Sequence, residues 1–352
     1  MTSNLRRAIT GAALGIGFAI SAANADSITI NETGSTLLYP LFKAWIDGYK
    51  SVAPDVVLTA ASTGSGVGID SALGGTVRIG ASDAYLSDEV AAHNPEILNI
   101  PLAISAVAIN YNLPGLNGAA IRISGPALAA IYSGGVTEWD DPKIKALNPG
   151  VELPHQAIIP VRRADASGDT FVFTQFLDFS AESWEDNPGY GTDIPWPKVA
   201  AEKTAPGNDG VIATLAATPY AIGYAGVSYA GEVAKAKLGT AVVENQAGKF
   251  VLASRQAIAD AAAQLDPRTP PYERISLVYA PGDTSYPLVN YEYALVSKTQ
   301  PNTATADAVR SFLIWAISAT GGNGDTYLTP VGFIPLPDFI RGLSQAQIKQ
   351  IR

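Results

Sequence analysis

The chain has 352 residues, a formal net charge of −9 at pH 7 and no cysteine. Its length suits two globular domains, and 47% hydrophobic against 16% charged residues excludes an intrinsically disordered protein. The acidic balance argues against a nucleic-acid partner, and the lack of cysteine excludes disulfides, thiolate metal sites and a cysteine nucleophile.

The first 25 residues have the pattern of a secretory signal peptide. Arg6 and Arg7 form a positive start, residues 8–22 are apolar, and Ala23-Asn24-Ala25 matches an A-x-A cleavage site. A membrane anchor is the alternative, but the apolar run is short for a bilayer span. Since no cysteine is available for a lipid anchor, we expect a secreted, freely soluble mature protein that is retained in a periplasm.

Strands alternate with helices in the first third of the chain. We expect strands at 26–30, 56–60 and 76–80, a helix at 37–49 and a short helix from 69. Gly64 and Gly66 give part of a dinucleotide-binding fingerprint, but Ile69 occupies the position of its third glycine. A nucleotide site is therefore poorly supported.

Asp83 directly follows the third expected strand. Ligands bind at the carboxyl ends of strands in open α/β sheets, which makes Asp83 a candidate ligand. The alternative is that Asp83 caps a turn or a helix.

A longer apolar run at 102–110 is expected to cross between domains, and short helices are expected at 126–132 and 141–147. A strand at 157–161 then leads into Arg162-Arg163-Ala164-Asp165-Ala166-Ser167-Gly168-Asp169-Thr170 and a helix. Ser167 suits the N-cap of that helix, whose free amides and a nearby guanidinium favour an anion. The alternative is a capped helix beside a surface arginine pair.

The remaining chain continues the alternation of helix and strand. Helices are expected at 209–217, 256–265, 303–319 and 337–351, and strands at 220–224, 275–279 and 289–296. This order predicts an α/β protein.

Three segments share one pattern, in which a strand is followed by glycine and hydroxyl residues and then by the start of a helix. They are Gly34-Ser35-Thr36, Gly64-Ser65-Gly66 and Ser167-Gly168-Asp169-Thr170. Together with Arg163 and Asp83 they predict one oxyanion held by amides, hydroxyls and a guanidinium.

The chain resembles the phosphate-binding protein (PstS) family of the bacterial phosphate ABC importer. The resemblance is carried by Thr33-Gly34-Ser35-Thr36-Leu37, Thr63-Gly64-Ser65-Gly66, Gly80-Ala81-Ser82-Asp83-Ala84, Trp139-Asp140-Asp141-Pro142-Lys143-Ile144 and Arg162-Arg163-Ala164-Asp165-Ala166-Ser167-Gly168. It implies a two-lobed α/β periplasmic binding protein fold of type II, with phosphate in the cleft between the lobes. The implied phosphate ligands are Ser35, Thr36, Leu37, Ser65, Asp83, Arg163, Ser167, Gly168 and Asp169.

The chemistry of Asp83 agrees with phosphate. Phosphate at neutral pH carries at least one proton and sulfate carries none, so an ionised Asp83 accepts the P–OH hydrogen but repels sulfate. Asp169 departs from the family, in which many members have Thr or Ser there. Its side-chain role and the preferred protonation state of phosphate stay open, whereas Asp165 is expected to orient Arg163.

We expect residues 26–108 and 276–352 to form one lobe and residues 109–275 the other. The expected function is capture of phosphate for an ABC permease by a monomer that has no cofactor, no metal and no enzymatic activity. The main alternative is a secreted phosphatase with Ser65 or Ser167 as nucleophile, which would need a base or metals. The two histidines, His93 and His155, lack metal-ligand spacing. A surface interaction module without a ligand is a third hypothesis.

Overall fold

The computed structural model describes residues 27–116, 120–185 and 188–352. The expected signal peptide, 1–25, lies outside these ranges. Within them, none of the helices combines the length and the apolar character that crossing a membrane requires.

The strands form one long mixed sheet and a small three-stranded sheet. Their bounds are β1 Ile28–Gly34, β2 Val56–Thr59, β3 Ile79–Ser82, β4 Ile97–Tyr111, β5 Arg122–Ile123, β6 Ile159–Arg163, β7 Lys203–Ala205, β8 Ala221–Gly226, β9 Gly239–Thr240, β10 Val242–Glu244, β11 Phe250–Val251 and β12 Val289–Ser297. The long sheet has the order β2-β1-β3-β12-β4-β8-β6-β7, with β9 beside β4, and the small one β11-β10-β5. β1 is parallel to β2 and β3, and β6 is parallel to β7 and β8.

Strand β4 joins the two halves of the long sheet. Residues 97–106 pair with β12, and residues 107–111 pair with β8. All of its residues except Ile97 are buried, which explains why this segment is an almost continuous apolar run. The expected crossover is therefore a single strand, while the lobe boundaries near 108 and 276 stay a prediction.

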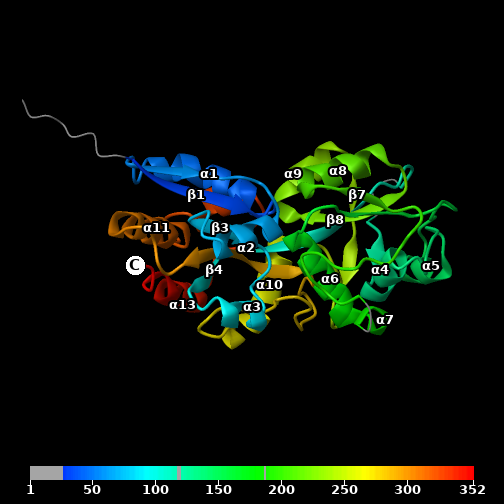
Figure 1. Ribbon diagram of the computed structural model, residues 1–352. Helices are drawn as coiled ribbons and strands as arrows, with labels where there is room; N and C mark the ends of the chain where they lie inside the picture. The colour runs from blue at the N-terminus through cyan, green and yellow to red at the C-terminus, as the bar shows by residue number, and fades with distance from the viewer. Residues whose placement is uncertain (1–26, 117–119, 186–187) are drawn as a thin grey trace, which may run out of the picture.

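Helices pack around both halves of the sheet. Their bounds are α1 Tyr39–Lys50, α2 Ser65–Leu73, α3 Asp88–His93, α4 Gly125–Tyr132, α5 Pro142–Leu147, α6 Gly168–Ser180, α7 Glu182–Glu185, α8 Gly207–Ala217, α9 Ala230–Lys235, α10 Arg255–Leu265, α11 Thr303–Ala316, α12 Asp325–Leu328 and α13 Asp338–Ile348. In Figure 1, α1, α11 and α13 surround one half, whereas α4, α5, α7 and α8 surround the other. Helices α2 and α6 meet between the halves, where the Gly66 amide donates to the Ala166 carbonyl at 3.0 Å.

Aromatic side chains of α1 and α11 pack against one another in the first half of the molecule. Phe42, Trp45 and Tyr49 of α1 meet Phe312 and Trp315 of α11, with ring centroids 5.1–6.3 Å apart. This aromatic cluster anchors α1, and with it the turn that precedes α1.

Most expected elements are present, with shifted ends. The strand expected at 275–279 is wrong, because this segment runs as irregular chain and turn, with Tyr279 at a φ of 59°. Leu277 and Val278 are nevertheless buried, so the apolar run reflects packing and not strand pairing. The third strand begins at Ile79 and not at 76, because a turn at Gly75, with a φ of 66°, occupies the preceding residues.

Candidate functional site

The chain turns sharply where β1 ends, and this turn presents Ser35. The side chain of Ser35 is fully buried and donates a hydrogen bond to the carboxylate of Asp83. Gly34 permits the close approach, because a Cβ there would lie 2.0 Å from the carbonyl oxygen of Ala81. The turn is thus pressed against β3, next to the residue that follows this strand.

Ser65, the first residue of α2, faces Asp83, which directly follows β3. The Ser65 hydroxyl accepts from the Asp83 amide at 3.2 Å and donates to Asp83 Oδ2 at 3.3 Å. Asp83 is 1% exposed. Burial raises its pKa, and hydrogen bonds from Glu292 and Ser35 oppose this rise.

Arg163, the last residue of β6, supplies the buried positive charge of this region. Its Nε donates to Asp165 Oδ1 at 2.8 Å, Nη2 donates to Asp165 Oδ2, and Nη1 donates to Asp169. Asp165 therefore orients the guanidinium, as expected from the sequence. Arginine has five N–H donors, so one hydrogen on each terminal nitrogen is left for a ligand.

Helix α6 begins against the Asp83 carboxylate. Ser167 is its N-cap and accepts from the Thr170 amide at 3.3 Å, as the sequence predicts. A Cβ on Gly168 would lie 2.2 Å from Asp83 Oδ2 and 2.4 Å from Ser65 Oγ. Only glycine lets the helix start come this close to the opposite half of the molecule.

Two buried backbone amides after β1 and two at the start of α6 have no acceptor within the described ranges, and the buried amides of Ser65 and Asn208 at the starts of α2 and α8 lack one as well. The first four belong to Thr36 and Leu37 after β1 and to Gly168 and Asp169 at the start of α6. A buried N–H without a partner is rare in folded proteins and costs free energy comparable to a lost hydrogen bond. Amides at a helix start beside a guanidinium are typical of an oxyanion site.

The structure brings all nine sequence-predicted site residues into this region. They are Ser35, Thr36, Leu37, Ser65, Asp83, Arg163, Ser167, Gly168 and Asp169, and every one of them is buried. Their roles as ligands stay a prediction.

Asn208, at the start of α8, was missed by the sequence prediction. It is 1% exposed, and its Nδ2 donates to Thr36 Oγ1 at 2.8 Å and to Asp169 Oδ2 at 2.9 Å. Its Oδ1 accepts from the Gly226 amide at 2.8 Å. Asn208 thus ties the two halves of the site together. The segment Pro206-Gly207-Asn208 repeats the pattern of small residues before a helix, but the three-residue strand β7 gave no clear signal.

Glu292 is the second missed residue, and it lies in the middle of β12. It is fully buried, and its Oε1 accepts from Ser105 Oγ at 2.5 Å and from Asn290 Nδ2 at 3.0 Å. Burial, followed by the neighbouring charge of Asp83, raises the pKa of Glu292 well above its usual range. Burial and the charge of Asp83 thus both favour the protonated, neutral form of Glu292. A carboxyl inside an apolar strand was the available signal.

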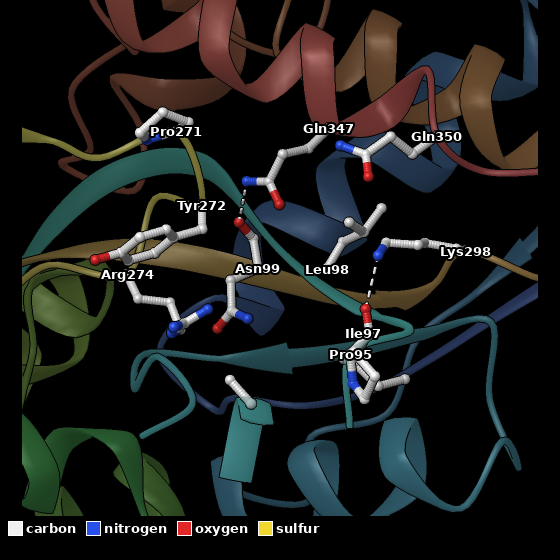
Figure 2. Close-up of a pocket in the computed structure, with 11 residues that line it drawn as sticks. Pro95, Ile97, Leu98, Asn99, Pro271, Tyr272, Arg274, Lys298, Gln347 and Gln350 are labelled. Carbon is white, nitrogen blue, oxygen red and sulfur yellow. Dashed lines mark hydrogen bonds between the residues drawn. The ribbon is translucent and has the colours of Figure 1, made fainter. Parts of the chain in front are cut away.

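A pocket of about 280 Å³ opens at the edge of the site and is lined in part by Thr36, Asp165 and Asn208. Figure 2 shows a different pocket, of about 260 Å³, lined by residues such as Asn99, Arg274, Lys298 and Gln347. It contains none of the nine predicted site residues, and Gln347 and Lys298 already donate to backbone carbonyls there. The candidate anion site therefore lies at the pocket beside Thr36, Asp165 and Asn208, and not at the pocket in Figure 2.

The described residues contain one group that could hold a metal ion by geometry, formed by Glu138, Asp140 and His155. Asp140 already accepts from Lys145 and from His155, each at 3.0 Å. The group is thus an ion-pair cluster near the surface, away from the nine site residues. His93 lies elsewhere, with its Nδ1 2.9 Å from the Glu89 carbonyl.

Comparison with known proteins gives a consistent result. Residues 19–320 match the family model of the PBP superfamily domain. The chain is 31% identical to the phosphate-binding protein PstS of Methanocaldococcus jannaschii over 93% of this chain and 87% of that protein. It is 32% identical to the PstS of Pasteurella multocida over 96% of this chain and 94% of that protein.

Solved structures show the same fold. A high affinity periplasmic phosphate-binding protein (PfluDING) bound with phosphate aligns with a TM-score of 0.72 and 22% identity, over 91% of this chain and 93% of that chain. A phosphate-binding protein from Stenotrophomonas maltophilia aligns with a TM-score of 0.69 and 21% identity, over 91% of this chain and 94% of that chain. The expected two-lobed α/β fold of the type II binding proteins is therefore confirmed.

Proposed function

This chain belongs to the PBP superfamily and, within it, to the PstS family of phosphate-binding proteins, and from this membership we propose that it captures inorganic phosphate for an ABC importer. Phosphate would lie between the two lobes, and its oxygens would accept hydrogen bonds from the amides that follow β1 and from those at the start of α6. Arg163 would supply the positive charge, and Ser35, Ser65 and Ser167 would supply hydroxyls.

The observation that carries this proposal is the group of buried amides without acceptors after β1 and at the start of α6. Folding leaves the N–H groups of Thr36, Leu37, Gly168 and Asp169 unsatisfied in one place, beside two free N–H donors of Arg163. A tetrahedral oxyanion offers enough lone pairs to satisfy all of them. A site for a cation or an apolar ligand would leave the same donors unpaired.

Asp83 supports phosphate over sulfate. The carboxylate is buried and already receives two hydroxyl donors, so it acts as an acceptor toward the ligand. The P–OH group of phosphate can donate to it, whereas sulfate would place an unprotonated oxygen against a buried charge. Such an unpaired contact costs about 2–5 kcal/mol, or about 10²- to 10³-fold in affinity.

We further propose that the protein is not an enzyme and that it acts as a periplasmic monomer that delivers phosphate to membrane permease subunits. Both histidines have partners elsewhere, so neither is available as a base for the hydroxyls of Ser65 and Ser167. A phosphatase would need a base or metals at one of these hydroxyls. Measured turnover of an aryl phosphate would favour the phosphatase alternative.

The test is calorimetric titration of phosphate-free protein with phosphate and, separately, with sulfate. We expect one phosphate per chain, no turnover, and sulfate binding weaker by about 10²-fold or more. Comparable affinity for both anions would contradict the role of Asp83. A silent titration with phosphate would favour an interaction module.

A further inference from the structure

Asp169 is a buried carboxylate with one satisfied and one unsatisfied oxygen. Its Oδ2 accepts from Arg163, from Asn208 at 2.9 Å and from Ser167 Oγ at 3.4 Å. Its Oδ1 is buried and has no hydrogen-bond partner in the described part of the chain. The side chain is 0% exposed, and its own amide is one of those without an acceptor. Oδ1 of Asp169 can therefore accept a hydrogen bond from a ligand in the anion site.

The charges around this site do not suit a dianion. Among the described residues, Arg163 is the only cationic side chain that contacts Asp169. Two nitrogens of its guanidinium already pair with Asp165. Asp83 adds a further carboxylate, since the start of α6 lies directly against it. With these carboxylates ionised the site is net negative, so a dianion would bring two more negative charges into it.

We propose that Asp169 makes phosphate binding take up a proton, so that phosphate is held with one hydrogen more than the free dianion carries. This inference rests on the proposed function. One hydrogen of the bound phosphate goes to Asp83, and a second lies between Asp169 Oδ1 and another phosphate oxygen. At alkaline pH the balance is one HPO₄²⁻ and one proton from solvent for each ligand bound.

Other titratable groups face Asp169 from the elements packed around it. They are Arg163 of β6, Asp165 of the following loop, Asp83 after β3, Tyr224 of β8 and Tyr229 after β8, with Glu292 of β12 behind Asp83. Burial raises the pKa of Asp169 to about 7, the charge of Asp83 adds to the rise, and Arg163 opposes it. At pH 8 the empty site therefore lacks the second hydrogen, and binding must supply it.

The direct test is calorimetry with inorganic phosphate at pH 8 in buffers of different ionisation enthalpy, which counts protons taken up per ligand. For the wild-type protein we expect an uptake of about one proton and a fall in affinity of about tenfold between pH 8 and pH 9. D169N should bind with almost no uptake and with nearly constant affinity over this range. D209N is the matched control, because Asp209 lies at the pocket edge and is exposed, and it should behave like the wild type.

Tight phosphate binding without proton uptake by the wild-type protein would overturn this inference and leave the proposed function intact. Uptake that persists in D169N would overturn the assignment to Asp169. Absence of any phosphate binding would overturn the proposed function and, with it, this inference. The wild-type measurement requires no variant, so a folding defect in D169N cannot obscure the result.

Discussion

Asp169 in the anion site and Glu273 beneath helix α13 are both 0% exposed, but their hydrogen-bond partners differ. Ser344 Oγ and Gln347 Nε2 donate to the two different oxygens of Glu273, so neutral groups of the chain itself satisfy this carboxyl. Asp169 keeps one oxygen without a partner and lies beside amides without acceptors. Burial alone therefore does not mark a functional carboxylate, whereas unsatisfied hydrogen-bonding capacity in a charged region does.

The largest loss of phosphate affinity is expected from substitution of Arg163 in the anion site. Substitution R163M removes the charge that faces the ligand and leaves Asp165 and Asp169 without their cation. Losing a buried charged hydrogen-bonding group costs about 2–5 kcal/mol, so phosphate affinity measured by calorimetry should fall by about 10²- to 10³-fold or more.

Arg162 offers a matched control, because it precedes Arg163 but pairs with Glu202 at 3.0 Å and lies over Trp196. R162M should keep phosphate affinity within about threefold, since partly exposed ion pairs contribute little. Similar losses in both variants would mean that the guanidinium of Arg163 has no special role.

The next effect concerns selectivity at Asp83. D83N replaces an acceptor-only carboxylate by an amide that can also donate to an unprotonated oxygen. We expect the ratio of phosphate to sulfate affinity to fall by about 10²-fold. D88N changes an exposed carboxylate that pairs with Arg274 and should leave the ratio unchanged. An unchanged ratio in D83N would show that another group detects the proton.

Gly168 tests how closely the helix start must approach the opposite half. In G168A the new methyl group would lie 2.2 Å from Asp83 Oδ2. This clash would push the two halves apart and keep the site from closing around the ligand. We expect phosphate affinity to fall by about tenfold or more, corresponding to about 1.4 kcal/mol. G342A in α13 is the control, because nothing lies within 4 Å of its added Cβ. Wild-type affinity in G168A would disprove the tight apposition.

The smallest effect on phosphate binding is expected from the Glu273 region, where a substitution should change stability and leave affinity unaltered. Burial raises the pKa of Glu273 to about 8, against hydrogen bonds from Gln347 and Ser344 that lower it. The folded protein therefore keeps a proton that the unfolded chain releases above about pH 4.5, so stability falls as pH rises through this window and levels off above about 8.

Substitution E273Q should remove this contribution, on the order of 3 kcal/mol between pH 5 and pH 8, while phosphate affinity stays unchanged. The measurement is denaturant unfolding of phosphate-free protein at both pH values, with the exposed E152Q as control. If E273Q unfolds with the same pH dependence as the wild type, Glu273 does not hold the proton.

The sequence predicted the parts of the site that follow a regular strand. Glycine and hydroxyl residues after β1, β2 and β6, and Asp83 after β3, lie at strand ends where local pattern alone indicates a turn. Their convergence followed because carboxyl ends of neighbouring strands meet at one edge of a sheet. The cap by Ser167 was likewise predictable, since it depends on residues only three positions apart.

Other parts depend on contacts that no local pattern contains. Asn208 bridges Thr36 and Asp169 across long sequence separations, and Glu292 reaches Asp83 only because β12 inserts between β3 and β4. The segment 275–279 is apolar because it is buried as irregular chain, so its composition wrongly indicated a strand. Tertiary packing, and not propensity, decided these cases.

The most direct test of the anion site is the nuclear magnetic resonance of its backbone amides during a phosphate titration. The amide signals of Thr36, Leu37, Gly168 and Asp169 should shift with saturation at one phosphate per chain, while those of Ser344 and Gln347 near Glu273 stay in place. Saturable phosphate binding that leaves the four amides unshifted would contradict the account, because the unsatisfied donors would then have another purpose.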